Sequence, residues 1–139
     1  MKKICIVTST RAEYGLLRNL INKVDKDPEL DLCLIVTGMH LSPEFGMTIS
    51  EIVADGYPIT EKIDILMSSD SISAISKTMG IASISFAEAF ERLKPDMLVV
   101  LGDRYEMLPI CACAVNAHIP IAHISGGETT EGAIDECIR

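Results

Sequence analysis

The feature that most constrains this chain is an alternation of short apolar runs with longer amphipathic stretches. Unbroken apolar runs are typical of strands buried on both faces of a parallel sheet, because a half-exposed strand alternates apolar and polar residues. Four unbroken runs predict the strands Ile4–Val7, Leu32–Val36, Met97–Leu101 and Ile119–Ala122. A weaker strand is predicted near Ile59–Ile65.

The amphipathic stretches between the runs predict helices, since their apolar residues recur at helical spacing. The first stretch carries a stripe of Leu16, Leu17, Leu20, Ile21 and Val24. The other helical segments are Ser71–Leu93, Tyr105–Ala117, a helix start at Ser42-Pro43 and another over Glu131–Arg139. Pro95 is expected to end the second helix, and Pro109 to lie near the first turn of the third. This order of elements predicts an α/β fold, a doubly wound parallel sheet with helices on both faces.

Composition limits the class of protein. A length of 139 residues allows one domain, residues 1–139, and 48% of the residues are apolar. The net charge of −8 disfavours nucleic acid and anionic membrane surfaces as partners, but local arginines still permit a small anionic ligand.

The apolar stretch Met107–Ile124 is broken by prolines and histidines, so no membrane span is predicted. No signal peptide is expected, because the apolar run after Met1-Lys2-Lys3 is only Ile4–Val7. The five cysteines have neither zinc nor redox spacing, so we expect a cytoplasmic protein with buried thiols.

Polar residues follow four of the predicted strands, where the chain leaves the sheet. Ligands of open α/β sheets bind beyond the carboxyl ends of the strands, which all meet at one edge. The segments concerned are Thr8–Gly15, Thr37–His40, Gly102–Glu106 and His123–Glu128. They bring two arginines, two histidines and several carboxylates to this edge, which is therefore the predicted site.

Arg11 and Arg104 each stand at the start of a predicted helix. Guanidinium groups bind phosphate through two parallel hydrogen bonds, and helix N-termini add backbone N–H donors. The two arginines therefore predict a clamp on a phosphate or diphosphate; the alternative is ordinary ion pairing with Glu13 or Glu106. The chain lacks both the GxGxxG motif and the GxxxxGK[ST] loop, so neither NAD nor ATP is favoured.

Carboxylates gather at the same edge: Asp103 follows the fourth strand, Glu128 follows a Gly-Gly pair, and Asp135 lies seven residues further on. Neighbouring carboxylates with pKa values pushed apart can remove and return protons, so catalysis is one interpretation. The alternative interpretation is helix capping or a turn.

Two histidines, His40 and His123, stand at strand ends, where a neutral imidazole can donate to a sugar hydroxyl or a phosphate. His118 is instead expected to have a structural role at the end of a helix. No group of residues has metal-ligand spacing, so no metal site is predicted. No serine lies in a GxSxG motif, so a hydrolase triad is unsupported.

Four segments resemble the hydrolysing UDP-N-acetylglucosamine 2-epimerases of sialic acid biosynthesis: Thr8–Gly15, Thr37–Gly46, Gly102–Arg104 and Gly126–Asp135. The resemblance runs from Lys2 to Arg139 and covers only the N-terminal part of such enzymes. It implies the N-terminal, Rossmann-like half of a GT-B type enzyme, with a C-terminal UDP-binding domain outside this chain. It also implies a homo-oligomer, a dimer or tetramer, for the whole enzyme, and little activity for these residues alone.

The family's reaction converts UDP-N-acetylglucosamine to N-acetylmannosamine and UDP by elimination and hydration, and it needs no cofactor. Position by position, Asp103 resembles the family's catalytic aspartate. Arg11 and Arg104 resemble its UDP contacts, with Gly15 lining the same pocket. Asp135 resembles the aspartate of a Gly-x-Ile-Asp segment.

One position departs from the family pattern. Many relatives have a catalytic glutamate in a His-Ile-Glu-Gly-Gly-Glu run where this chain has Ser125. Serine is no equivalent base at neutral pH, so either Glu128 or Glu131 takes over, or the substrate differs. The sister enzymes of legionaminic acid synthesis, which act on a UDP-2,4-diacetamido-trideoxyhexose, are the obvious alternative.

Three further classes of protein stay open. A non-hydrolysing UDP-N-acetylglucosamine 2-epimerase would release a UDP-sugar, and a GT-B glycosyltransferase would transfer the sugar. A non-catalytic flavodoxin-like binding domain would instead bind Mg²⁺ or be phosphorylated at Asp103.

Overall fold

The computed structural model describes residues 2–41, 48–65, 71–102 and 105–124. Within them, one sheet is formed by β1 (Lys2–Thr8), β2 (Leu30–Thr37), β3 (Glu61–Ile63), β4 (Met97–Leu101) and β5 (Ile121–Ile124). The strand order is β3-β2-β1-β4-β5, and every pair is parallel. The predicted doubly wound sheet is therefore confirmed. Its strand order reverses between β1 and β4, which makes this pair the topological switch point.

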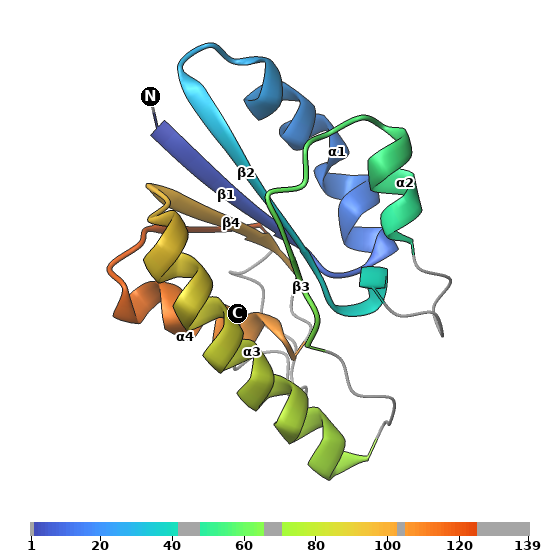
Figure 1. The fold of residues 1–139 in the computed structure, drawn as a ribbon, viewed down its shortest axis with the longest axis vertical. Helices are drawn as coiled ribbons and strands as arrows, with labels where there is room; N and C mark the ends of the chain where they lie inside the picture. The colour runs from blue at the N-terminus through green and yellow to red at the C-terminus, as the bar shows by residue number, and fades with distance from the viewer. Residues whose placement is uncertain (1, 42–47, 66–70, 103–104, 125–139) are drawn as a thin grey trace.

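Helices cover both faces of the sheet (Figure 1). The helices α1 (Arg11–Lys26) and α2 (Ile49–Ala54) lie on one face, and α3 (Ile72–Leu93) and α4 (Met107–Asn116) lie on the other. Successive side chains of a strand point to opposite faces, so Ile6 packs in the layer under α1 whereas Cys5 and Val7 pack in the layer under α3 and α4. A short 3₁₀ helix, η1 (Gly38–Leu41), follows β2.

The two long helices begin at side-chain caps. Thr10 caps α1, its Oγ1 accepting a hydrogen bond from the Glu13 backbone N–H at 3.2 Å. Ser71 caps α3 in the same way, through the Ala74 N–H at 3.1 Å. The helix α3 ends as predicted before Pro95, with Lys94 in the left-handed conformation at a φ of 46°. Pro109 is the third residue of α4, where its missing N–H costs no intrahelical bond.

Two predictions need correction. The strand predicted over Ile119–Ala122 begins instead at Ile121, because Pro120 has no N–H to donate to the ladder. His123 therefore lies inside β5 rather than after it. The predicted apolar stripe of α1 is wrong at one position, because Leu16 is 72% exposed. Tyr14, which was not predicted to be part of the stripe, is buried in the core.

The prediction of buried thiols is partly confirmed for the four described cysteines, and Cys137 lies outside the described residues. Cys5 and Cys33 are buried and lie opposite each other on β1 and β2. Cys111 and Cys113 on α4 are only half-buried, and the Cys113 thiol donates to the Ser83 carbonyl of α3 at 3.3 Å. Burial raises the pKa of Cys111 to about 11, which keeps it protonated at neutral pH. None of the helices in the described part of the chain has the length and apolar character that a membrane span requires.

Candidate active site at the carboxyl edge of the sheet

Ser9 lies at the centre of the carboxyl edge, the edge where the strands' carboxyl ends meet. It directly follows β1, its side chain is fully buried, and its Oγ lies 2.9 Å from Oε1 of Glu106. Glu106 stands at the start of α4, in the connection after β4. The two connections that flank the switch point are therefore in direct contact. This is the position at which α/β sheets of this type bind ligands.

A second buried carboxylate, that of Glu13, holds Ser9 from the other side. The Ser9 backbone N–H donates to Glu13 Oε2 at 3.0 Å, and the Ser9 Oγ lies 3.0 Å and 3.2 Å from the two Glu13 oxygens. Glu13 is 5% exposed and Glu106 is 2% exposed. Buried carboxylates need hydrogen-bond donors, and Ser9 supplies one from its main chain and one from its side chain.

The connection after β2 joins the same cluster through His40. Its backbone N–H donates to the Ser9 carbonyl at 3.2 Å. Its Nε2 lies 2.9 Å from Thr8 Oγ1 and its Nδ1 2.8 Å from Thr48 Oγ1. Burial lowers the pKa of His40 to about 4, so the ring is neutral at physiological pH. Because the ring is fully buried with both nitrogens bonded, this geometry favours a structural role over the predicted contact with substrate.

Gly38 allows this close approach. Its φ is +62°, and a Cβ built on it would lie 2.9 Å from the Ser9 Cβ and 3.2 Å from the Ser9 carbonyl oxygen. A side chain at position 38 would therefore force Ser9 to move.

The end of β4 is fixed against β5 on the other side of the switch point. The Gly102 N–H donates to the Ile124 carbonyl at 3.0 Å, and His123 Nε2 bonds the Gly102 carbonyl. Gly102 has a φ of +85°, which favours glycine. Because a carbonyl only accepts, the bonded Nε2 of His123 carries the hydrogen. His123 is half-buried and lies at the predicted edge of the sheet. One of its ring nitrogens is hydrogen-bonded to the backbone.

Of the other predicted site residues, two lie in the described part of the chain and the rest lie outside it. Arg11 is the first residue of α1, as predicted, and Gly15 lies in the second turn on an exposed face, with nothing within 4 Å of a built Cβ. Residues outside the described part of the chain are Asp103, Arg104, Ser125, Glu128, Glu131 and Asp135, as well as the helix starts predicted at Ser42 and over Glu131–Arg139. Their roles therefore stay predictions.

Sequence reasoning missed the buried cluster of Ser9, Glu13 and Glu106, and considered the two glutamates only as ion-pair partners of the arginines. One signal was available, because Thr10-Arg11-Ala12-Glu13 has the Thr-x-x-Glu spacing of a helix capping box. No local sequence pattern marks Glu106. It lies beside Ser9 only because β4 is the neighbour of β1 in the sheet.

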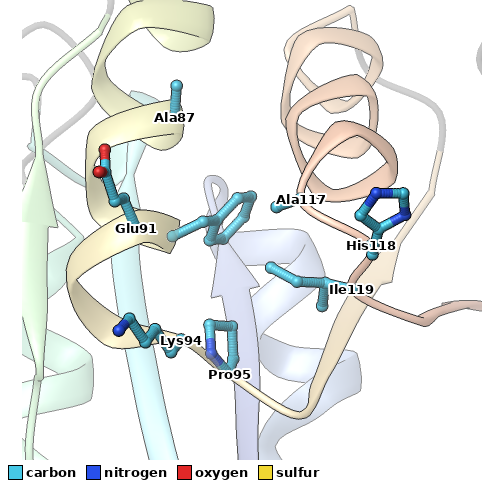
Figure 2. Close-up of a pocket in the computed structure, with 8 residues that line it drawn as sticks. Ala87, Glu91, Lys94, Pro95, Ala117, His118 and Ile119 are labelled. Carbon is cyan, nitrogen blue, oxygen red and sulfur yellow. The ribbon is translucent and has the colours of Figure 1, made fainter.

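A groove of about 340 Å³ lies elsewhere, between the C-terminal ends of α3 and α4 (Figure 2). Its lining includes Lys94 and Pro95, just before β4, and His118 and Ile119, just before β5. It therefore lies at the amino edge of the sheet, opposite the cluster around Ser9. His118 follows α4 with its N–H donating to the Val115 carbonyl, so its predicted place at the end of a helix is confirmed. Among the described residues, no group of three histidines, cysteines or carboxylates is arranged to hold a metal ion.

The strand order and the polar cluster at the switch point place this chain in the class of doubly wound α/β proteins. The chain belongs to the UDP-N-acetylglucosamine 2-epimerase family, whose sequence profile matches residues 22–139. The family resemblance inferred from the sequence is thus confirmed.

Two relatives illustrate this membership, and one solved structure shares the fold. The chain is 52% identical over 138 residues to the GDP/UDP-N,N'-diacetylbacillosamine 2-epimerase (hydrolyzing) of Campylobacter jejuni, covering 99% of this chain and 36% of that protein. It is 39% identical to the UDP-N,N'-diacetylbacillosamine 2-epimerase (hydrolyzing) of Legionella pneumophila, covering 100% and 37%. The crystal structure of UDP-GlcNAc 2-epimerase from Neisseria meningitidis bound to UDP-GlcNAc superimposes with a TM-score of 0.79 and 21% identity, covering 94% and 34%. The chain thus spans just over a third of the length of these relatives.

Proposed function

We propose that the whole protein is a hydrolysing 2-epimerase of a UDP-sugar, and that residues 1–139 supply one wall of its active site. The observation that carries the proposal is the contact between Ser9 and Glu106, which joins the β1 and β4 connections at the switch point of a chain from this family. These two connections contain Arg11, Asp103 and Arg104, the residues that the sequence nominates for UDP and for catalysis. A second domain outside this chain would hold most of the nucleotide, in the GT-B arrangement.

The proposed reaction has two steps. A carboxylate removes the proton from C2 of the sugar, the C1–O bond breaks, and UDP leaves with the bonding pair, giving a 2-acetamidoglucal. Water then adds across the double bond, its oxygen at C1 and a proton at C2 from the opposite face. The sum is UDP-sugar plus water giving the free epimeric sugar plus UDP, with no oxidant or cofactor required.

The predicted roles follow from this chemistry. Asp103 is our proposed acid or base, and Glu128, Glu131 and Asp135 supply the further proton transfers that two opposite faces require. Arg11 and Arg104 stabilise the negative charge that develops on the departing diphosphate. Together, Arg11 and Arg104 would give an acidic protein the local positive charge that a UDP-sugar needs.

We propose UDP-N,N'-diacetylbacillosamine as the substrate, although the sequence alone placed UDP-N-acetylglucosamine first. The relatives from Campylobacter jejuni and Legionella pneumophila, which carry this substrate in their names, support the choice. Ser125 in place of the usual glutamate also suits a changed substrate. UDP-N-acetylglucosamine is the second candidate, supported by the description of the family.

The test is to incubate the whole protein with each of the two UDP-sugars in D₂O and to follow products by NMR. We expect free epimeric sugar and UDP in equal amounts from UDP-N,N'-diacetylbacillosamine, with deuterium at C2. A UDP-linked epimer without free UDP would show a non-hydrolysing enzyme. Preferred turnover of UDP-N-acetylglucosamine would overturn the substrate assignment, and no turnover of either sugar would overturn the proposed function.

A further inference from the structure

Two buried cysteines lie side by side in the middle of the sheet. Cys5 of β1 and Cys33 of β2 are direct partners in the parallel register. Both side chains belong to the apolar layer under α3 and α4, where Cys5 is 0% exposed and Cys33 is 2% exposed. Their spacing along the chain gives no sign of this pair, since only the register of two strands brings the thiols together.

The register suits a disulfide between the two thiols. Neighbouring strands lie about 4.7–4.9 Å apart, and the Cα atoms of disulfide-bonded cysteines lie about 4.4–6.8 Å apart. The bond can therefore form without separating β1 from β2. The two thiols are already hydrogen-bonded to each other. Because a disulfide is uncharged and has two hydrogens fewer than two thiols, the apolar layer can hold it.

The two thiols differ in their tendency to ionise. The Cys5 S–H donates to the Cys33 sulfur, and this hydrogen bond lowers the pKa of Cys33. The same hydrogen bond, together with burial, raises the pKa of Cys5. Lys3 favours the thiolate of both residues, and Glu61 opposes it. Since the thiolate is the form that oxidants attack, Cys33 reacts first and Cys5 is placed to attack the product.

Cys33 has a short path to solvent on the side of β3. The pairing of β2 with β3 starts at Ile35, so none of the described strands covers that side of β2 at Cys33. The exposed residue Thr60 lies there, and its hydroxyl donates a hydrogen bond to Cys33. Short edge elements open locally more readily than central strands. This path admits an oxidant as small as hydrogen peroxide and excludes bulky disulfides such as oxidised glutathione.

We propose that Cys5 and Cys33 form a peroxide-sensitive dithiol, which hydrogen peroxide converts to a disulfide between β1 and β2. The Cys33 thiolate attacks one oxygen of the peroxide, the O–O bond breaks, and hydroxide leaves, giving a sulfenic acid. The Cys5 sulfur then attacks the Cys33 sulfur, the S–O bond breaks, and the Cys5 proton leaves with the hydroxyl as water. In sum, two thiols and one peroxide give one disulfide and two waters, so sulfur is oxidised and peroxide oxygen is reduced. The modification requires no UDP-sugar and goes beyond the proposed function.

The first experiment maps the thiols of the whole folded protein after treatment with hydrogen peroxide. Free thiols are alkylated in denaturant, and the protein is digested with trypsin without reduction and analysed by mass spectrometry. We expect the tryptic peptides 4–11 and 27–62 to be joined with the loss of two hydrogens, and dithiothreitol to release them. Absence of this linked pair would overturn the proposal, as would equally fast linkage by oxidised glutathione.

The half-buried cysteines of α4 are an internal control in the same digest. Burial raises the pKa of both Cys111 and Cys113, so each stays a thiol at neutral pH although each is more exposed than Cys33. We expect both to be alkylated after the peroxide treatment. Oxidation of Cys111 or Cys113 ahead of Cys33 would show that exposure alone decides reactivity, which would overturn the proposal.

Single variants separate the roles of the two thiols. In Cys5→Ser the hydroxyl still donates to Cys33, but no second thiol follows, so we expect added oxygen to accumulate on Cys33. In Cys33→Ser we expect Cys5 to stay reduced, and Cys111→Ser is the matched control that leaves the linkage unchanged. Oxygen added to Cys5 as fast as to Cys33 would overturn the order of attack. Mapping of the unaltered protein decides the proposal even if a variant fails to fold.

Thermal unfolding gives a readout that is independent of mass spectrometry. The new bond would close a loop that contains α1, so we expect the oxidised protein to unfold on the order of 5 °C higher than the reduced protein. Dithiothreitol should reverse this shift. A lower unfolding temperature after oxidation would show that the bond pulls β1 and β2 out of their register, which would overturn the geometric basis of the proposal.

Discussion

The hydroxyl of Tyr14 in α1 donates a hydrogen bond of 2.5 Å to the carboxylate of Asp55, directly after α2. Arg18 completes the arrangement, with its Nε 3.1 Å from the same Asp55 oxygen and its guanidinium 5.2 Å from the centre of the Tyr14 ring. The rings of Tyr14 and His40 also meet at right angles, with 6.2 Å between ring centres. These contacts join the short helix α2 to α1 and, through His40, to the cluster around Ser9.

Tyr14→Phe should lower the free energy of unfolding by about 1–2 kcal/mol, because Asp55 loses a donor. Burial and the Asp55 carboxylate raise the pKa of Tyr14 above its ordinary value of 10. The stabilisation is therefore complete below pH 10 and is lost as the pH rises further, since the unfolded chain ionises first. Urea unfolding of the whole protein at pH 8 and pH 11 measures both effects. Tyr57→Phe, on the same side of the sheet, is the control; an equal loss in that variant would contradict the role given to Asp55.

His40→Gln should remove part of the acid sensitivity of the fold. The pKa of about 4 in the folded state lies below the ordinary value of 6.5, so the unfolded chain takes up the proton first. Stability is therefore fully present above pH 6.5 and falls as the pH drops toward 4, by an amount on the order of 3 kcal/mol. Unfolding curves of the protein and the variant at several pH values give the difference in slope. An NMR titration with an apparent pKa of His40 near 6.5 would contradict this expectation.

Gly38→Ala should destabilise the protein more than Gly56→Ala. Both glycines have positive φ, +62° and +82°, so each alanine costs about 1–2 kcal/mol in backbone conformation. Only at position 38 does the new Cβ meet Ser9, at 2.9 Å, which adds about 1–3 kcal/mol of overpacking. Nothing lies within 4 Å at position 56. The difference between the urea midpoints of the two variants measures the cost of the contact between the new Cβ and Ser9. Equal losses of stability in the two variants would show that Ser9 moves aside without cost.

Asp103→Asn should abolish turnover by the whole protein while UDP affinity stays within about twofold, because the amide keeps the shape and loses the proton-transfer group. Steady-state release of UDP and calorimetry with UDP separate the two quantities. Asp31→Asn changes an exposed carboxylate on β2 and is expected to leave both unaltered. Near-normal turnover by Asp103→Asn would assign the chemistry to another carboxylate.

The bounds of the elements with a complete apolar pattern, such as β4 and α3, were predicted to within about one residue. The bounds of β4, Met97–Leu101, agree with the prediction, and α3 begins after Ser71 and ends before Pro95 as expected. The helix α2 was not predicted. It has only six residues and buries only Ile52, so its sequence shows no helical repeat of apolar residues. The strand β3 is shorter than predicted and pairs on one side with β2, as an edge strand does.

The candidate site was predicted at the level of topology rather than contacts. That polar residues would gather at the carboxyl edge followed from the parallel sheet, and His123 and the start of α1 lie there. The bond between Ser9 and Glu106 joins residues 97 apart, and no local pattern in the sequence specifies it. Likewise, the burial of His40 depends on Thr8 and Thr48, which only the tertiary fold brings to its two nitrogens.

The parallel sheet also dictates the order in which a growing chain can build this protein. Each strand must await a crossover before its neighbour exists, and the β1–β2 pair can form once residue 37 has left the ribosome. β1 then waits, with one backbone edge open, until residues 97–99 arrive to pair with Ile4–Ile6. Ser9 meets Glu106 later still, so a nascent chain holds the half-built sheet while all the residues between β2 and Glu106 are added. Stalled or truncated translation products would expose that unpaired edge and are the forms most prone to aggregate.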